Sequence, residues 1–86
     1  MKPGDWIRQR HQKDAPERLV CAFAPINGVL VTWNEQEGYR WALRLSCEVI
    51  REGSPVDRMR AEDLCRPKNL GCRQHLEWIF GTQVHP

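Results

Sequence analysis

The dipeptide Asn27-Gly28, set between two apolar runs, is the strongest local constraint in this sequence. Both central residues of a type I′ turn need a positive φ, so Asn-Gly predicts a tight β-hairpin. The flanking runs, 18–26 and 29–33, are the predicted strands. A two-residue loop would build one wholly apolar core face from three pairs: Ile26–Val29, Ala24–Val31 and Ala22–Trp33.

A period-two pattern follows over 39–50. Its apolar positions are Tyr39, Trp41, Leu43, Leu45, Cys47 and Val49. Alternation of this length favours a strand with one buried face. Some of these residues also recur at helical spacing, but a helix would scatter them around its axis, so the strand ranks first. The polar loop 35–38 would join this strand to 29–33 as a second hairpin.

The two ends of the chain carry further signals. Residues 4–11 are typical of a first strand, and a polar loop follows over 12–17. After a turn at 52–55, residues 61–64 would form one helical or 3₁₀ turn before a short strand at 65–66. A helix is predicted over 69–80, with Asn69 as N-cap and Gly81 just beyond its end. Residues 82–86 would form a frayed tail.

The length of 86 residues predicts a single domain, 1–86. A domain this small buries a modest share of its surface, so its four tryptophans would supply much of the core. The predicted elements give a mainly β protein of the α+β class. We expect a small antiparallel barrel or a strongly bent sheet of four or five strands over 4–66, with a C-terminal helix over 69–80.

The compartment follows from what the sequence lacks. No apolar run approaches the ~20 residues of a membrane span. Residues 1–6 contain no apolar stretch of the secretory type. We therefore expect a cytoplasmic protein without a membrane partner. In a reducing compartment the four cysteines would be free thiols and not a disulfide framework.

The formal net charge is +2, from 13 basic and 11 acidic residues. This value excludes an acidic DNA mimic, but it is too small to indicate nucleic-acid binding by itself. Ten of the 13 basic residues are arginine. The planar guanidinium suits phosphates and base edges, and it suits carboxylates in a protein interface equally well.

The order of these signals resembles the SH3-like small barrels of the KOW and Tudor kind over 4–66. The opening 4–8, Gly-Asp-Trp-Ile-Arg, looks like their first strand, and a polar loop then leads into the hairpin. A long fourth strand follows, and 59–65 looks like the closing element, a 3₁₀ turn before the last strand. The segment 39–53 is longer than the usual fourth strand, which suggests a sharp bend or an open sheet. The resemblance implies binding of nucleic acids or protein tails without choosing between them.

A basic and aromatic face is the first candidate site. Arginines neutralise phosphates, and an exposed tryptophan offers a stacking surface for a base. The residues that would form this face are Trp6, Arg8, Arg10, Lys13, Arg18, Arg40 and Arg44. We therefore expect a nucleic-acid-binding accessory protein whose partner is DNA or RNA. The alternative for each residue is an ordinary solvated face whose charge is balanced by neighbouring acids.

Metal binding and catalysis have little support. Cys65, Cys72 and His75 are the candidate zinc ligands, but structural zinc needs four and the spacing matches no finger pattern. The alternation over 39–50 favours a core position for Cys47. No nucleophile–base motif or phosphate loop is present. We expect a non-catalytic protein without a cofactor or metal.

The predicted C-terminal helix suggests another function. It is apolar on more than one side, so part of it could reach a partner. Trp78, Phe80 and Arg73 would be the anchors of such a protein interface. The alternative function is therefore a protein–protein interaction module. It would be an adaptor or inhibitor, of the kind that phages and mobile elements encode, and a homodimer is one possible assembly.

Overall fold

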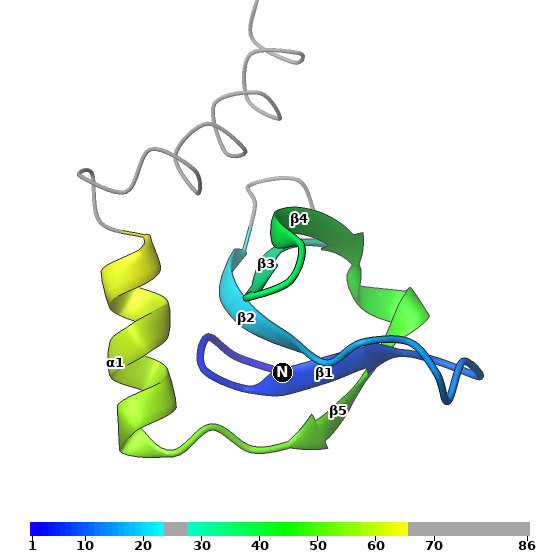
Figure 1. Ribbon diagram of the computed structural model, residues 1–86, viewed down its shortest axis with the longest axis horizontal. Coiled ribbons are helices and arrows are strands. Elements are labelled where there is room, and N and C mark those ends of the chain that lie inside the picture. Colours follow the sequence, from blue (N-terminus) through cyan, green and yellow to red (C-terminus); the bar gives the residue numbers. More distant parts are fainter. Residues whose placement is uncertain (24–27, 66–86) are drawn as a thin grey trace, which may run out of the picture.

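The computed structural model describes residues 1–23 and 28–65, and they form five strands and two helical elements (Figure 1). The strands are β1 (Trp6–Gln9), β2 (Arg18–Phe23), β3 (Val29–Asn34), β4 (Gly38–Leu43) and β5 (Cys47–Arg51). A 3₁₀ turn, η1 (Arg44–Ser46), separates β4 from β5, and the helix α1 (Pro55–Leu64) follows β5. The predicted helix over 69–80 and the tail over 82–86 lie outside the described residues.

All neighbouring strands are antiparallel, in the spatial order β4-β3-β2-β1-β5. The sheet bends strongly, so that β4 and β5 stand on opposite sides of its concave face (Figure 1). These two edge strands do not pair within the described part of the chain, so the sheet is open and not a closed barrel. The prediction of a mainly β protein with a strongly bent sheet is confirmed.

The single long strand predicted over 39–50 is wrong. The chain leaves β4 at Leu43, turns through η1 and re-enters the sheet beside β1 as β5. Two backbone hydrogen bonds hold the turn: Arg44 N–H donates to the Gly28 carbonyl at 2.7 Å, and Arg10 N–H donates to the Ser46 carbonyl at 2.9 Å. The expected apolar stripe is accordingly not a buried face, because Leu45 at η1 is 86% exposed.

The hairpin exists, but its predicted register is wrong. Ala22 pairs with Val31 and Leu19 pairs with Trp33, because β2 already ends at Phe23 and the register shifts between Val20 and Ala22. The connection between the strands is therefore longer than two residues. Gly28 does have the positive φ, 85°, that the turn signal implied.

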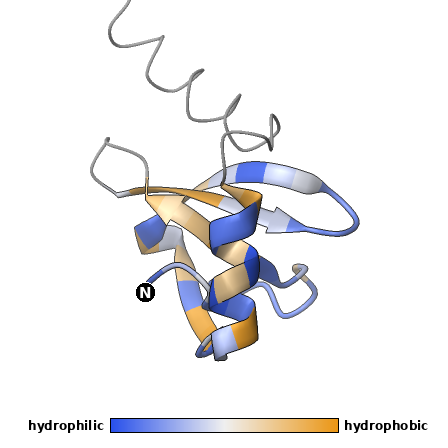
Figure 2. Ribbon diagram, turned by 90° about the vertical axis from the view of Figure 1, so that its left-hand side faces the viewer, coloured by the Kyte–Doolittle hydropathy of each residue, from blue (hydrophilic) through white to orange (hydrophobic). Residues whose placement is uncertain are grey.

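The core occupies both faces of the sheet. On the inner face Ile7, Val20, Leu30 and Cys47 form one buried cluster. On the outer face Cys21 and Val31 form a second cluster, covered by Trp33, Tyr39, Leu64 and Cys65. Figure 2 shows hydrophobic residues along the central strands and hydrophilic residues in the loops. Burial on both faces explains why β2 and β3 are nearly continuous apolar runs instead of alternating ones.

The helix α1 covers the outer face, where the sequence had suggested only one turn at 61–64 and a strand at 65–66. Ser54 and Asp57 form a capping box: the Ser54 hydroxyl accepts from Asp57 N–H, and the Asp57 carboxylate accepts from Ser54 N–H. Pro55 at the first helical position fits this start. Ala61 is completely buried against the sheet. No helix among the described residues is long and apolar enough to cross a membrane.

The N-terminal turn joins the sheet to the start of α1. The first strand is shorter than the predicted 4–11, because Gly4 lies in a turn with a φ of 98°. Asp5 is 2% exposed, and its Oδ1 accepts from Gly53 N–H at 2.9 Å. Its Oδ2 accepts from Lys2 N–H at 3.1 Å. This buried carboxylate therefore fixes the β5–α1 connection against the beginning of the chain.

Candidate polar groove and basic end

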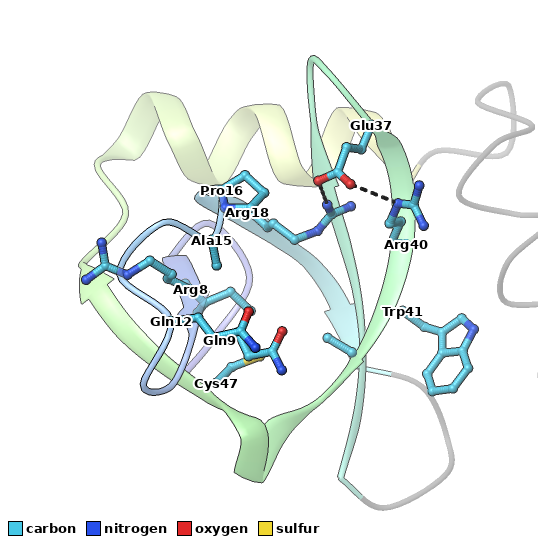
Figure 3. A pocket seen from close by; sticks show the side chains of 12 residues that line it. Arg8, Gln9, Gln12, Ala15, Pro16, Arg18, Glu37, Arg40, Trp41 and Cys47 are labelled. Atoms are coloured by element: carbon cyan, nitrogen blue, oxygen red, sulfur yellow. Dashed lines mark hydrogen bonds and ion pairs between the residues drawn. The ribbon is translucent and has the colours of Figure 1, made fainter.

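An open groove lies on the inner face of the bent sheet, beside the β1–β2 loop (Figure 3). Its volume is about 280 Å³. The lining residues come from both halves of the sheet and from that loop: Ile7, Arg8, Gln9, Gln12, Ala15, Pro16, Arg18, Glu37, Arg40, Trp41, Ala42 and Cys47. The groove exists because the edge strands β4 and β5 stand apart at this point. The β1–β2 loop covers only part of the gap between them.

Arg18 is fixed at one side of the groove. Its Nε donates to Thr32 Oγ1 at 2.8 Å, its Nη1 to Glu37 Oε1 at 2.7 Å and its Nη2 to the Gly38 carbonyl at 3.1 Å. Burial lowers the pKa of Arg18, and the Glu37 carboxylate opposes that shift. Glu37 Oε2 also lies 3.5 Å from Arg40 Nε. Glu37 thus bridges two arginines, of which Arg18 has a structural role and Arg40 keeps a side chain that is 61% exposed.

The middle of the groove combines amides with small apolar groups. Gln9 and Gln12 are exposed, and their side-chain amides make no hydrogen bond to the rest of 1–23 and 28–65. Cys47 contributes a thiol that is 7% exposed. Burial raises the pKa of Cys47, although Arg10 and Arg18 act in the opposite direction. A protonated thiol is a poor nucleophile, so this residue belongs to the core, as the sequence suggested.

Three cations belong to the two segments that meet at this end of the sheet, the β1–β2 loop and η1, and we call Arg10, Lys13 and Arg44 the basic end. Arg10 Nε donates to the Cys47 carbonyl at 3.1 Å, which holds its side chain along the junction of η1 and β5. Lys13 and Arg44 are exposed. None of the three has an ion-pair partner among the described residues, whereas Arg18, Arg40, Arg51 and Arg60 all do.

Charge is separated along the molecule. Segments 9–14 and 44–47 carry the three cations of the basic end against Asp14, which leaves a net +2. Segment 52–63 carries two arginines against four acids, a net −2. The β1–β2 loop and η1 lie on the opposite side of the sheet from α1 (Figure 1). The net charge of +2 for the whole sequence does not show this separation, because the charges of the two ends cancel in the sum.

Trp6 and Arg8 do not join the basic end as the sequence suggested. The Trp6 ring is half-buried beneath the Arg51 guanidinium, whose carbon lies 4.9 Å from the ring centroid. Arg8 pairs across the strands with Glu48. In Figure 3 its guanidinium points away from the other labelled side chains. The structure therefore places Arg10, Lys13 and Arg44 in segments at one end of the sheet, sets Arg18 and Arg40 with Glu37 on one side of the groove, and leaves Trp6 beside α1.

The remaining predicted site residues are only partly described. The interface anchors Arg73, Trp78 and Phe80, and the metal candidates Cys72 and His75, lie outside the described residues. Cys65 follows α1 and packs on the outer-face cluster. No disulfide joins Cys21, Cys47 and Cys65 within the described residues. Within 1–23 and 28–65 no three His, Cys, Asp or Glu side chains gather as metal ligands would.

Sequence reasoning missed Gln9, Gln12 and Glu37 as site residues. Gln9 ends β1 and Gln12 lies in the polar loop after it, and only the fold places both in the lining of the same groove as Arg40 and Cys47. A signal for Glu37 did exist. It precedes Gly38 in the tight β3–β4 turn, where Gly38 has a φ of 71° and Asn34 Oδ1 accepts from Glu37 N–H at 2.6 Å. Such a turn holds the Glu37 carboxylate close to the strands on either side.

These features define a small mainly β domain with an open polar groove on the inner face of its sheet and a cationic end next to that groove. Comparison with protein-family models, with curated proteins and with solved structures returned no match. The functional argument therefore rests on the chemistry of the groove and the basic end.

Proposed function

We propose that the protein is a small nucleic-acid-binding module that contacts phosphates through its basic end. The observation that carries this proposal is that Arg10, Lys13 and Arg44, in segments at one end of the sheet, have no ion-pair partners among the described residues. A cation that is not neutralised within the protein is available to replace the counterions of a phosphate backbone.

The separation of charge supports the same proposal. The described residues contain ten cations and ten acids, so their net charge is zero, yet opposite ends of the sheet carry +2 and −2. A polyanion would meet an attractive potential at the basic end and a repulsive one at α1, and this difference orients the encounter. The resemblance to SH3-like barrels supports the proposal only through the first strand, the polar loop and the hairpin, because 59–65, expected as the closing 3₁₀ turn, belongs to α1 and its C-cap.

Fluorescence anisotropy with short single- and double-stranded DNA and RNA, at low and at physiological salt, tests the proposal. We expect binding that weakens steeply as the salt concentration rises. The variant Lys13→Glu/Arg44→Glu should lose most of it, because two attractive charges become repulsive. Both side chains are exposed and make no hydrogen bond within the described residues, so the fold should survive.

The matched control is Lys2→Glu/Arg58→Glu, which makes the same change in net charge away from the basic end. It should keep most of the affinity. Equal losses in the two double variants would mean that net charge alone matters and would contradict the assignment of the basic end. Absence of binding to every nucleic acid at low salt, where electrostatic attraction is least screened, would overturn the proposed function.

A further inference from the structure

We infer that the groove receives an unpaired base, so that the preferred ligand is a single strand and not a duplex. This inference rests on the proposed function and adds a ligand class to it. The basic end explains attraction to any phosphate backbone, but it does not explain why a polar groove opens beside it.

The position of the groove is the first argument. Gln9 and Gln12 in its lining alternate along the chain with Arg10 and Lys13 of the basic end. Arg40, with its side chain 61% exposed, stands on the opposite side of the groove (Figure 3). A strand crossing the groove would therefore find the basic end on one side of an inserted base and, on the other, the exposed Arg40, which shares the Glu37 carboxylate with Arg18.

The chemistry of the lining is the second argument. Each glutamine amide offers a carbonyl acceptor and an NH₂ donor, the groups that hydrogen-bond to base edges. The amides of Gln9 and Gln12 have no partner within the described residues. Ala15, Pro16 and Ala42 supply small apolar surfaces nearby, against which a flat ring can pack.

The size of the groove is the third argument. At about 280 Å³ it is smaller than the ~300–1,000 Å³ typical of sites for drug-sized ligands, so it suits one flat ring. Bases in a duplex are stacked and paired, and they must leave the stack before a pocket can take them. A single strand presents such bases without that cost, which favours it over a duplex of the same charge density.

The test compares a short labelled DNA strand, the blunt duplex of the same sequence and an abasic strand of equal length, all at one salt concentration. We expect the ordinary strand to bind at least roughly tenfold more tightly than the abasic strand and the duplex. The variant Ala15→Phe, which fills the groove without changing charge, should remove this preference and leave duplex binding unchanged. Met59→Phe on α1, which is 70% exposed in the native protein, is the matched control and should keep the preference.

A second variant, Gln9→Ala/Gln12→Ala, protects the test against misfolding of Ala15→Phe, since both glutamines are exposed. It should reduce the affinity for the ordinary strand toward that for the abasic one. Equal binding of ordinary and abasic strands, or an unchanged preference in both groove variants, would overturn the inference while leaving the basic-end proposal standing. Loss of all nucleic-acid binding at low salt would instead overturn both, and the groove would then be assigned to a protein segment.

Discussion

At the scale of single residues, the Glu37 carboxylate pairs with two arginines and so reduces the positive charge that they could offer to a ligand. The sequence alone predicts that Arg18 and Arg40 belong to a basic surface, but in the structure both side chains form ion pairs with Glu37. Arg18 is 13% exposed and makes three hydrogen bonds, so it contributes to the fold. Arg44, by contrast, is exposed, and no acid lies within ion-pair distance of it among the described residues.

Glu37→Ala should lower the free energy of unfolding by about 1–3 kcal/mol, because it leaves a mostly buried guanidinium without its charged partner. Urea denaturation followed by tryptophan fluorescence measures this loss. The double variant Arg18→Met/Glu37→Ala should recover part of the stability, since the orphaned charge is then gone. A loss for Glu37→Ala below about 0.5 kcal/mol would show that solvent satisfies Arg18 and that the ion pair is only a surface one.

At the scale of elements, the capping box decides where α1 begins. Ser54 and Asp57 exchange hydrogen bonds, and Pro55 supplies a φ suited to the first helical position. The signal was present in the sequence as Ser-Pro-Val-Asp, but the pattern of 52–55 was interpreted as a turn alone. The helix buries few apolar side chains, since Val56 and Met59 are 72% and 70% exposed. The apolar residues of 55–64 therefore gave no clear helical periodicity by which to predict α1.

The stability of this helix should depend on pH through Asp57. Hydrogen bonds from the Ser54 backbone and hydroxyl lower the pKa of Asp57, with smaller contributions from Trp6 and Arg51. A carboxyl whose folded pKa is depressed stabilises the protein above its unfolded pKa, about 3.9, and that contribution is lost as the pH falls through the folded value. Thermal unfolding of Asp57→Asn should therefore show a lower Tm than the native protein at pH 7, by roughly 4–8 °C.

The same comparison at acid pH completes this test. The difference in Tm between Asp57→Asn and the native protein should shrink as the pH falls below about 4 and through the lowered pKa of folded Asp57, because the native carboxyl then loses its charge. Glu62→Gln, which removes an exposed carboxylate later in α1, serves as the control and should change the Tm little at either pH. A pH-independent difference for Asp57→Asn would assign the effect to side-chain geometry instead of charge.

At the scale of the whole molecule, separation of charge matters more than its sum. The basic end and the acidic α1 segment lie on opposite sides of the sheet, because β5 carries the chain from η1 across the molecule to α1 (Figure 1). The resulting dipole would orient the approach of the polyanion proposed above, even though the described residues are neutral overall.

This dipole leads to a prediction about salt dependence. If Arg10, Lys13 and Arg44 each contact one phosphate, each single change to alanine should reduce the slope of log K against log salt by about 1. The slope is obtained from anisotropy titrations at several salt concentrations. Arg18→Ala should weaken the fold but leave the slope of the remaining folded protein unchanged, because Glu37 already neutralises that arginine. A reduced slope in Arg18→Ala would place Arg18 among the phosphate contacts.

The sequence by itself determined the class of fold. Apolar runs on both sides of Gly28 require a buried hairpin, and a polar turn before Gly38 requires a second one, since only short-range sterics and burial are involved. The positive φ of Gly28 and the burial of Cys47 follow from the same local rules. The cationic character of 8–13 was equally evident from the residues alone.

Only the tertiary structure decided the rest. Period-two alternation continues through Arg44–Ser46, so nothing local reveals that β4 and β5 belong to opposite edges of the sheet. The register of β2 against β3 depends on where the strand ends and on the shift after Val20, and both are set by packing against the whole sheet. The pairing of Arg18 with Glu37 joins residues 19 positions apart, and the groove joins residues from 7 to 47. Such long-range contacts exist only once the sheet has bent and brought its strands together.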